Sequence, residues 1–199
     1  MISTFRPVHY PTDSAWRIPS TDECLKYWHT YNLPEHIREH SRLVAAAAEH
    51  ICCLARKKGL DAPLKAVVAS ALLHDLGKFY CIKHGGSHNQ LGASLVMELT
   101  GNPAIAQGVM HHIYWPGEID IHKFFLPLVI IYCDKRVKHD KIVPLEARFQ
   151  DLYDRYGINE RMRGLIYKSW QQALAIQTRL NQALETDLNA CTFNCRGMV

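Results

Sequence analysis

Apolar residues recur at helical spacing along most of the chain, and proline, glycine or asparagine separates one helical stretch from the next. The clearest stretch covers residues 35–59, which are rich in alanine and leucine and repeat their apolar positions every three or four residues. Before it, a Ser or Thr cap with acidic residues in the first turn predicts a helix over 20–30. The pattern predicts a protein built almost wholly of helices.

A central helix is expected over residues 64–79, because nearly every face of this predicted helix is apolar until His74. A loop over 81–88 should follow it. The run over 124–138 suits strand or helix by its apolar content, and helix is favoured because its neighbours are helical. Further helices are expected over 89–101, 103–113, 145–157 and 159–186.

The organisation of the 199 residues predicts one domain, because the chain has no repeat, no low-complexity tract and no Gly/Ser-rich linker. We expect an all-α bundle of about seven helices. Its core should lie over 20–156, and C-terminal helices over 158–187 would cover that core or serve a homodimer.

The cellular setting follows from what the sequence lacks. No apolar run approaches the roughly 18 residues of a membrane span, and the first residues have no signal-peptide pattern. Seven cysteines without a Cys-x-x-Cys pair predict reduced thiols. We therefore expect a cytoplasmic protein with no membrane partner.

A net charge of +4, from 23 basic and 19 acidic residues, favours an anionic substrate. The basic residues are scattered, so no duplex nucleic acid is expected as a partner. Arg148 and Arg155 are expected to form salt bridges or a solvated face and not to contact substrate. The twelve histidines are more informative, since neutral imidazole is the commonest metal ligand in proteins.

Candidate metal ligands fall at one point on each of several predicted helices. A helix gives only one or two side chains to a central point, so a metal site in a bundle must collect its ligands in this way. Imidazole and carboxylate without thiolate suit Fe, Mn, Co, Ni or Zn in a catalytic site. Four histidines and two aspartates would serve two ions that share a carboxylate. The candidates are His40, His74, Asp75, His88, His111 or His112, and Asp134.

The motifs around these candidates are similar to those of a known family. His74 and Asp75 stand in LLHDLGK, His40 stands in HSRLVA, and Asp134 stands in YCDKRV. In sequence order they are a histidine, then the His-Asp doublet, then a distant aspartate. This pattern resembles the HD-domain superfamily of metal-dependent phosphohydrolases, which is named for the doublet. The resemblance covers about residues 20–156 and implies the helical bundle of that superfamily with one or two divalent metal ions.

Two further histidines between the doublet and the last aspartate resemble the two-metal branch of the superfamily. His88 stands in HNQLGA, and VMHHIYWPG supplies the other, for which His111 is favoured over His112. The loop IYWPGEI lacks the Gly-Tyr-Pro signature of the cyclic dinucleotide phosphodiesterases, so that activity is disfavoured.

The resemblance implies hydrolysis of a phosphoester or phosphoanhydride bond by a metal-activated water. The substrate would be a small phosphorylated molecule, with a nucleotide favoured. Asp75 would bridge the ions, Lys78 would contact the phosphate, and Gly77 would let substrate approach the backbone. His112 and Arg136 are weaker candidates for substrate binding.

Two other functions remain open on the sequence. Some members of the superfamily use the same six ligands in a di-iron oxygenase. A regulatory module that binds a nucleotide without turnover is the second alternative.

Overall fold

The computed structural model describes residues 7–10, 15–191 and 193, and most of its regular structure is helical. The predicted all-α class is therefore confirmed. Two short antiparallel strands, β1 (Val137–Lys138) and β2 (Lys141–Ile142), pair after α7. The helices are α1 (Thr21–Thr30), α2 (Glu35–Lys57), α3 (Leu64–Leu73), α4 (Lys78–His84), α5 (His88–Thr100), α6 (Pro103–His111), α7 (Phe125–Arg136), α8 (Leu145–Tyr156) and α9 (Glu160–Leu184).

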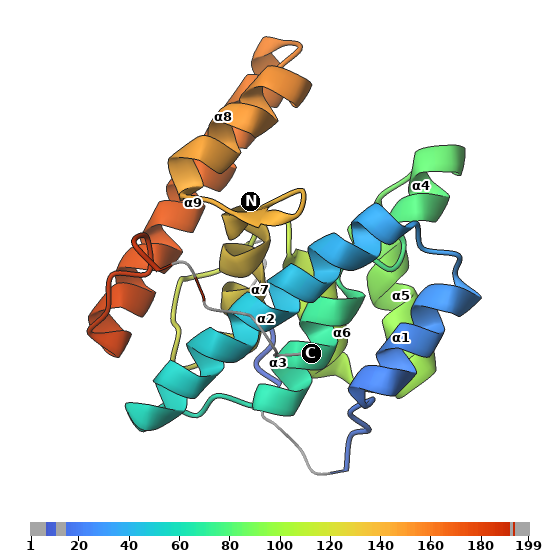
Figure 1. The fold of residues 1–199 in the computed structure, drawn as a ribbon, viewed down its shortest axis with the longest axis horizontal. Coiled ribbons are helices and arrows are strands. Elements are labelled where there is room, and N and C mark those ends of the chain that lie inside the picture. The colour runs from blue at the N-terminus through green and yellow to red at the C-terminus, as the bar shows by residue number, and fades with distance from the viewer. Residues whose placement is uncertain (1–6, 11–14, 192, 194–199) are drawn as a thin grey trace, which may run out of the picture.

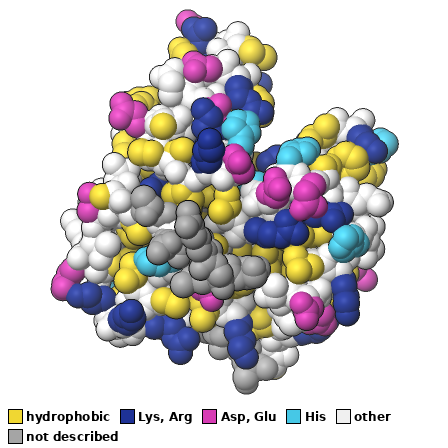
Figure 2. Space-filling view, in the orientation of Figure 1, with side chains coloured by type: hydrophobic (Ala, Val, Ile, Leu, Met, Phe, Trp, Pro, Cys, Tyr) yellow, Lys and Arg dark blue, Asp and Glu magenta, His cyan; other side chains and the backbone are white. Residues whose placement is uncertain are grey.

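Helix α3 lies at the centre of the fold and packs against α1, α2, α6 and α7. Helix α2 runs across the front of the central helices in Figure 1. The α8–α9 hairpin projects at one side of the molecule and α4 at the other. On the face shown in Figure 2, a notch separates these two projections. The apolar surroundings of α3 and α7, whose residues are almost all buried, make the centre of the fold rigid.

Several helices begin where the sequence supplies a capping residue. The Ser20 side chain and Glu23 form a reciprocal capping box at the start of α1. The Asn102 side chain accepts hydrogen bonds from the backbone at the start of α6, where Pro103 is the first helical residue. Trp28 then joins α1 to the centre, because its indole Nε1 donates to the Leu72 carbonyl at 2.8 Å.

The predicted helix over 64–79 is wrong at its end, because α3 stops at Leu73 and a tight turn separates it from α4. Within this turn the Lys78 backbone N–H donates to the Asp75 carbonyl at 2.9 Å. The predicted loop over 81–88 is also wrong in part, since α4 continues to His84.

Gly77 lets this turn pack directly against α5. A Cβ atom at Gly77 would lie 2.7 Å from the His88 carbonyl oxygen and 2.8 Å from the Gly92 backbone nitrogen. The expectation that Gly77 admits substrate to the backbone is therefore replaced by a packing role: the glycine brings the His-Asp doublet close to α5.

The predicted helix over 124–138 is also too long. The chain leaves the helical conformation at Val137, whose φ and ψ of −105° and 120° are extended, and enters β1. His139, with a φ of 55°, makes the left-handed turn between β1 and β2.

Reduced cysteines and the lack of a membrane-spanning helix were expected, and both can be compared with the described residues. The cysteines in this part of the chain are free of disulfides, whereas Cys195 lies outside it. Over the same residues, no helix combines the length and apolar character that crossing a membrane requires.

Gly108 allows a close contact among three central helices, which generates a stability prediction. A Cβ atom there would lie 2.3 Å from Ser70 Oγ on α3 and 2.5 Å from Leu126 Cδ2 on α7. Gly108→Ala should therefore destabilise the protein by about 1–3 kcal/mol through overpacking. Differential scanning calorimetry should show a melting temperature several degrees lower.

Gly164 provides the matched control, because it is also inside a helix and nothing lies within 4 Å of the position that a Cβ atom would take there. Gly164→Ala should be neutral or stabilising by up to about 1 kcal/mol. Equal melting temperatures for the two variants would contradict the packing described around Gly108.

Candidate metal centre

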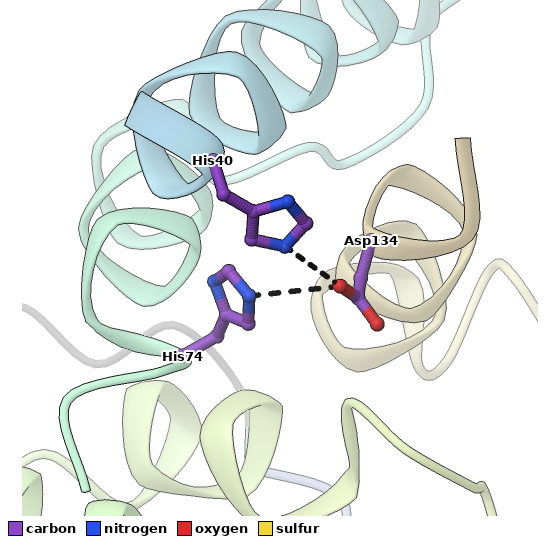
Figure 3. A group of neighbouring side chains, drawn as sticks. All are labelled: His40, His74 and Asp134. Atoms are coloured by element: carbon purple, nitrogen blue, oxygen red, sulfur yellow. Dashed lines mark hydrogen bonds and ion pairs between the residues drawn. The ribbon is translucent and has the colours of Figure 1, made fainter. Parts of the chain in front are cut away.

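The first group of candidate ligands lies where α2, α3 and α7 meet. It consists of His40 on α2, His74 directly after α3, and Asp134 near the end of α7. Figure 3 shows the three side chains pointing toward one another. His40 Nε2 lies 3.0 Å from Asp134 Oδ1, and His74 Nε2 lies 3.7 Å from the same oxygen. All three residues are buried, so the group is held by the core of the fold.

The second group consists of Asp75, His88 and His112. Asp75 lies in the turn after α3, His88 is the first residue of α5, and His112 follows the last residue of α6. The Nε2 atoms of His88 and His112 are 3.1 Å apart. Asp75 and His112 are buried, whereas His88 is partly exposed and marks the open side of this group.

The Asp75 carboxylate joins the two groups. Its Oδ2 lies 3.4 Å from His74 Nε2 and 3.9 Å from His40 Nε2. Its Oδ1 lies 3.4 Å from His88 Nε2 and 3.7 Å from His112 Nε2. One carboxylate therefore turns a different oxygen toward each group, which is the arrangement of a carboxylate shared by two ions.

Backbone hydrogen bonds orient two of the imidazoles. His74 Nδ1 donates to the Ala71 carbonyl at 2.7 Å, and His112 Nδ1 donates to the Val109 carbonyl at 2.7 Å. In both rings the other nitrogen, Nε2, then faces the candidate ligands. This pattern is typical of metal-binding histidines, whose second nitrogen is usually fixed by a hydrogen bond to the protein.

Two buried polar atoms at the centre support the fit of a metal. His74 Nε2 and Asp75 Oδ1 have no hydrogen-bond partner among the described residues. Leaving such atoms buried and unsatisfied is costly. A divalent ion accepts electron pairs from imidazole nitrogen and carboxylate oxygen, so the donor set fits an ion in each group.

Burial keeps three of the histidines in the neutral form that binds metal. It lowers the pKa of His40 despite the opposing effect of Asp134, and it lowers the pKa of His88. Burial and the neighbouring His74 together lower the pKa of His112 to about 3. At His74 burial also lowers the pKa, but the carboxylates of Asp75 and Asp134 outweigh it and the pKa is raised.

Lysines accompany both aspartates. Lys78 Nζ lies 2.7 Å from Asp75 Oδ2, and Lys135 forms a short ion pair with Asp134 Oδ2. Burial alone would raise the pKa of both carboxyl groups. At Asp75 the charges of His74 and Lys78 hold the pKa well below its usual range, and at Asp134 the charge of Lys135 and the hydrogen bond with His40 do the same.

His112, and not the favoured His111, lies with the second group. The His111 ring packs edge-on against Trp115, with the ring centroids 5.3 Å apart. Both residues have helical backbone at the end of α6, so their side chains point about 100° apart and only one faces the centre. His112 thus moves from a candidate for substrate binding to a candidate ligand.

Arg136 does not reach the site, which corrects its assignment as a candidate for substrate binding. Its guanidinium is buried and donates to the carbonyls of Leu188, Asn189 and Cys191. It also donates to the Val143 carbonyl at 2.7 Å. The residue therefore anchors the segment after α9 to the end of α7.

Comparison with known proteins agrees with the geometry. A family model described as the HD domain matches residues 37–157, which include all six clustered residues. The chain belongs to the HD-domain family, whose superfamily is of the metal-dependent phosphohydrolase type. No curated protein and no solved structure matches the chain.

Sequence reasoning missed Lys135 as a residue of the site. A lysine directly after Asp134, in YCDKRV, was the available signal. Neighbouring residues on a helix usually face different directions. The long lysine side chain overcomes this separation and returns to the carboxylate beside it.

The positions of His111 and His112 generate a prediction about metal content. His112→Gln should lower the amount of Mn²⁺ retained per chain, because it removes one nitrogen from the second group. Inductively coupled plasma mass spectrometry after loading and desalting would measure it. His111→Gln is the matched control and should retain the wild-type amount. Loss of metal in the control, with retention in His112→Gln, would contradict the placement of these residues.

Proposed function

We propose that the protein is a metal-dependent phosphohydrolase that cleaves a phosphoester or phosphoanhydride bond in a small substrate, with a nucleotide favoured. The observation that carries this proposal is the Asp75 carboxylate, which joins two groups of candidate ligands and has a lysine ammonium 2.7 Å away. A paired metal site beside a lysine cation suits a phosphoryl group, which needs charge neutralisation and positioning.

Divalent ions at such a site polarise a phosphoryl oxygen and lower the pKa of a bound water. The residues that would hold them are His40, His74 and Asp134 in one group, and His88 and His112 in the other, with Asp75 between. In hydrolysis the water oxygen forms a new bond to phosphorus, the bond from phosphorus to the leaving oxygen breaks, and that oxygen takes up a proton.

Lys78 is positioned to bind the phosphate. Its side chain is 37% exposed, whereas the Asp75 side chain beside it is 1% exposed. The Lys78 side chain therefore contacts a buried carboxylate and also reaches solvent. Burial alone would lower the pKa of Lys78, but Asp75 and Asp134 raise it, so the side chain carries its charge at neutral pH.

Substitution of Asp75 and Lys78 tests the proposal. Protein supplied with Mn²⁺, Co²⁺ or Fe²⁺ should release phosphate from a panel of nucleotides or from an aryl phosphate, and Asp75→Asn should abolish this release. Lys78→Met should lower kcat by about 10²-fold, the typical effect of losing one preorganised charge contact. Lys65→Met, at the far end of α3 and exposed, is the matched control and should keep full activity.

The same assays separate the other functions. A hydrolase works without oxygen, whereas an oxygenase requires iron and oxygen. Tight nucleotide binding with no product after long incubation with metal would support the regulatory module. Undiminished phosphate release by Asp75→Asn would contradict the proposed hydrolase directly.

A further inference from the structure

Three basic side chains gather around a single carboxylate on the α8 side of the molecule. Lys138 Nζ lies 3.3 Å from Asp151 Oδ1. Arg148 and Arg155 approach Asp151 Oδ2 at 3.1 and 3.6 Å. The salt bridges expected for these arginines are therefore confirmed. We call Lys138, Arg148 and Arg155 the α8 basic cluster.

The charges of the α8 basic cluster are not balanced. One aspartate faces three cations, which leaves a surplus of positive charge. Asp151 carries its charge, because the three cations lower its pKa despite the opposing effect of burial. Near the metal centre, by contrast, Lys78 and Lys135 each have an aspartate of their own. Like charges held together repel one another, so an arrangement of this kind favours an added anion.

The cluster borders the candidate metal centre. Lys138 is in β1, which directly follows the helix that carries Asp134, and α8 packs against α7. In Figure 2, Lys, Arg and His side chains lie on both sides of the notch between the α8–α9 hairpin and the α4 side of the molecule, and Asp and Glu side chains lie at its base.

The side chains of the cluster retain donors for a ligand. Arg148 Nε is buried and has no hydrogen-bond partner among the residues that the structure describes. The side chains of Lys138 and Arg155 are 36% and 46% exposed, so both reach solvent. A salt bridge that served stability alone would need only one of the three cations, and exposed pairs contribute little.

We propose that the α8 basic cluster binds a second phosphate group, so that the substrate class is small molecules that carry two phosphates. One phosphate would lie at Lys78 in the metal centre and the other at Arg148 and Arg155. The planar guanidinium groups suit this role, because they donate paired hydrogen bonds to phosphate oxygens. This inference rests on the proposed function for the first phosphate and names the substrate class of the same site.

Binding of non-hydrolysable bisphosphonates tests the inference without turnover. Isothermal titration calorimetry on the full chain loaded with Mn²⁺ would compare methylene-, propane-1,3- and hexane-1,6-bisphosphonate with the matching alkyl monophosphonates. At least one bisphosphonate should bind about tenfold tighter than its monophosphonate, the effect of one added charged contact. The chain length that binds best would report the separation of the two anion sites.

The variants identify the residues responsible. Arg148→Gln and Arg155→Gln should each remove most of the bisphosphonate advantage, and Arg155→Gln is expected to fold normally because its side chain is nearly half exposed. Arg179→Gln, an exposed arginine on α9, is the matched control and should keep the advantage. The inference is overturned if no bisphosphonate binds tighter than its partner, or if the cluster variants keep the full advantage.

These outcomes are separable from those of the proposed function. If the protein releases phosphate from monophosphates, but substitutions in the α8 basic cluster do not change bisphosphonate affinity, the hydrolase is supported and the second phosphate site is contradicted. If bisphosphonates bind tighter through Arg148 and Arg155 but the protein hydrolyses no substrate, the second phosphate site is supported and the proposed hydrolase is contradicted.

Discussion

The buried carboxylate of Asp75 is the constraint on which the rest of the site depends. A carboxylate with an exposed fraction of 1% is strongly destabilising unless charges and donors of the protein compensate it. Here the compensation comes from both groups of histidines and from Lys78, which approach it from α2, α4, α5 and the ends of α3 and α6. The helices of the bundle are thereby tied to one point, and ions at that point would strengthen the same contacts.

The turn between α3 and α4 is what places this carboxylate. Gly77 makes the turn possible at this depth, since any side chain there would collide with the backbone of α5. The buried apolar residues of α3 before the turn exclude water and hold His74 in place. Packing and the proposed metal site thus depend on the same few residues.

The helical class and the family follow from the sequence because amphipathic spacing and the His-Asp motifs are local signals. The end of α3 near the His-Asp doublet does not follow from the sequence, since a tight turn and a helix have nearly the same pattern of apolar residues there. The choice between His111 and His112 depends on the rotation of α6 against its neighbours, which a sequence does not show. Arg136 was misplaced for a similar reason: the carbonyls that bind it come from a segment about 50 residues later in the chain.

The central claim is that Asp75 stands between two metal ions, and anomalous X-ray diffraction tests it most directly. Crystals grown with Mn²⁺ and measured at the manganese edge should show two anomalous peaks. One should lie among His40, His74 and Asp134, and the other between His88 and His112, with Asp75 contributing one oxygen to each. A single peak, or peaks remote from Asp75, would contradict the account.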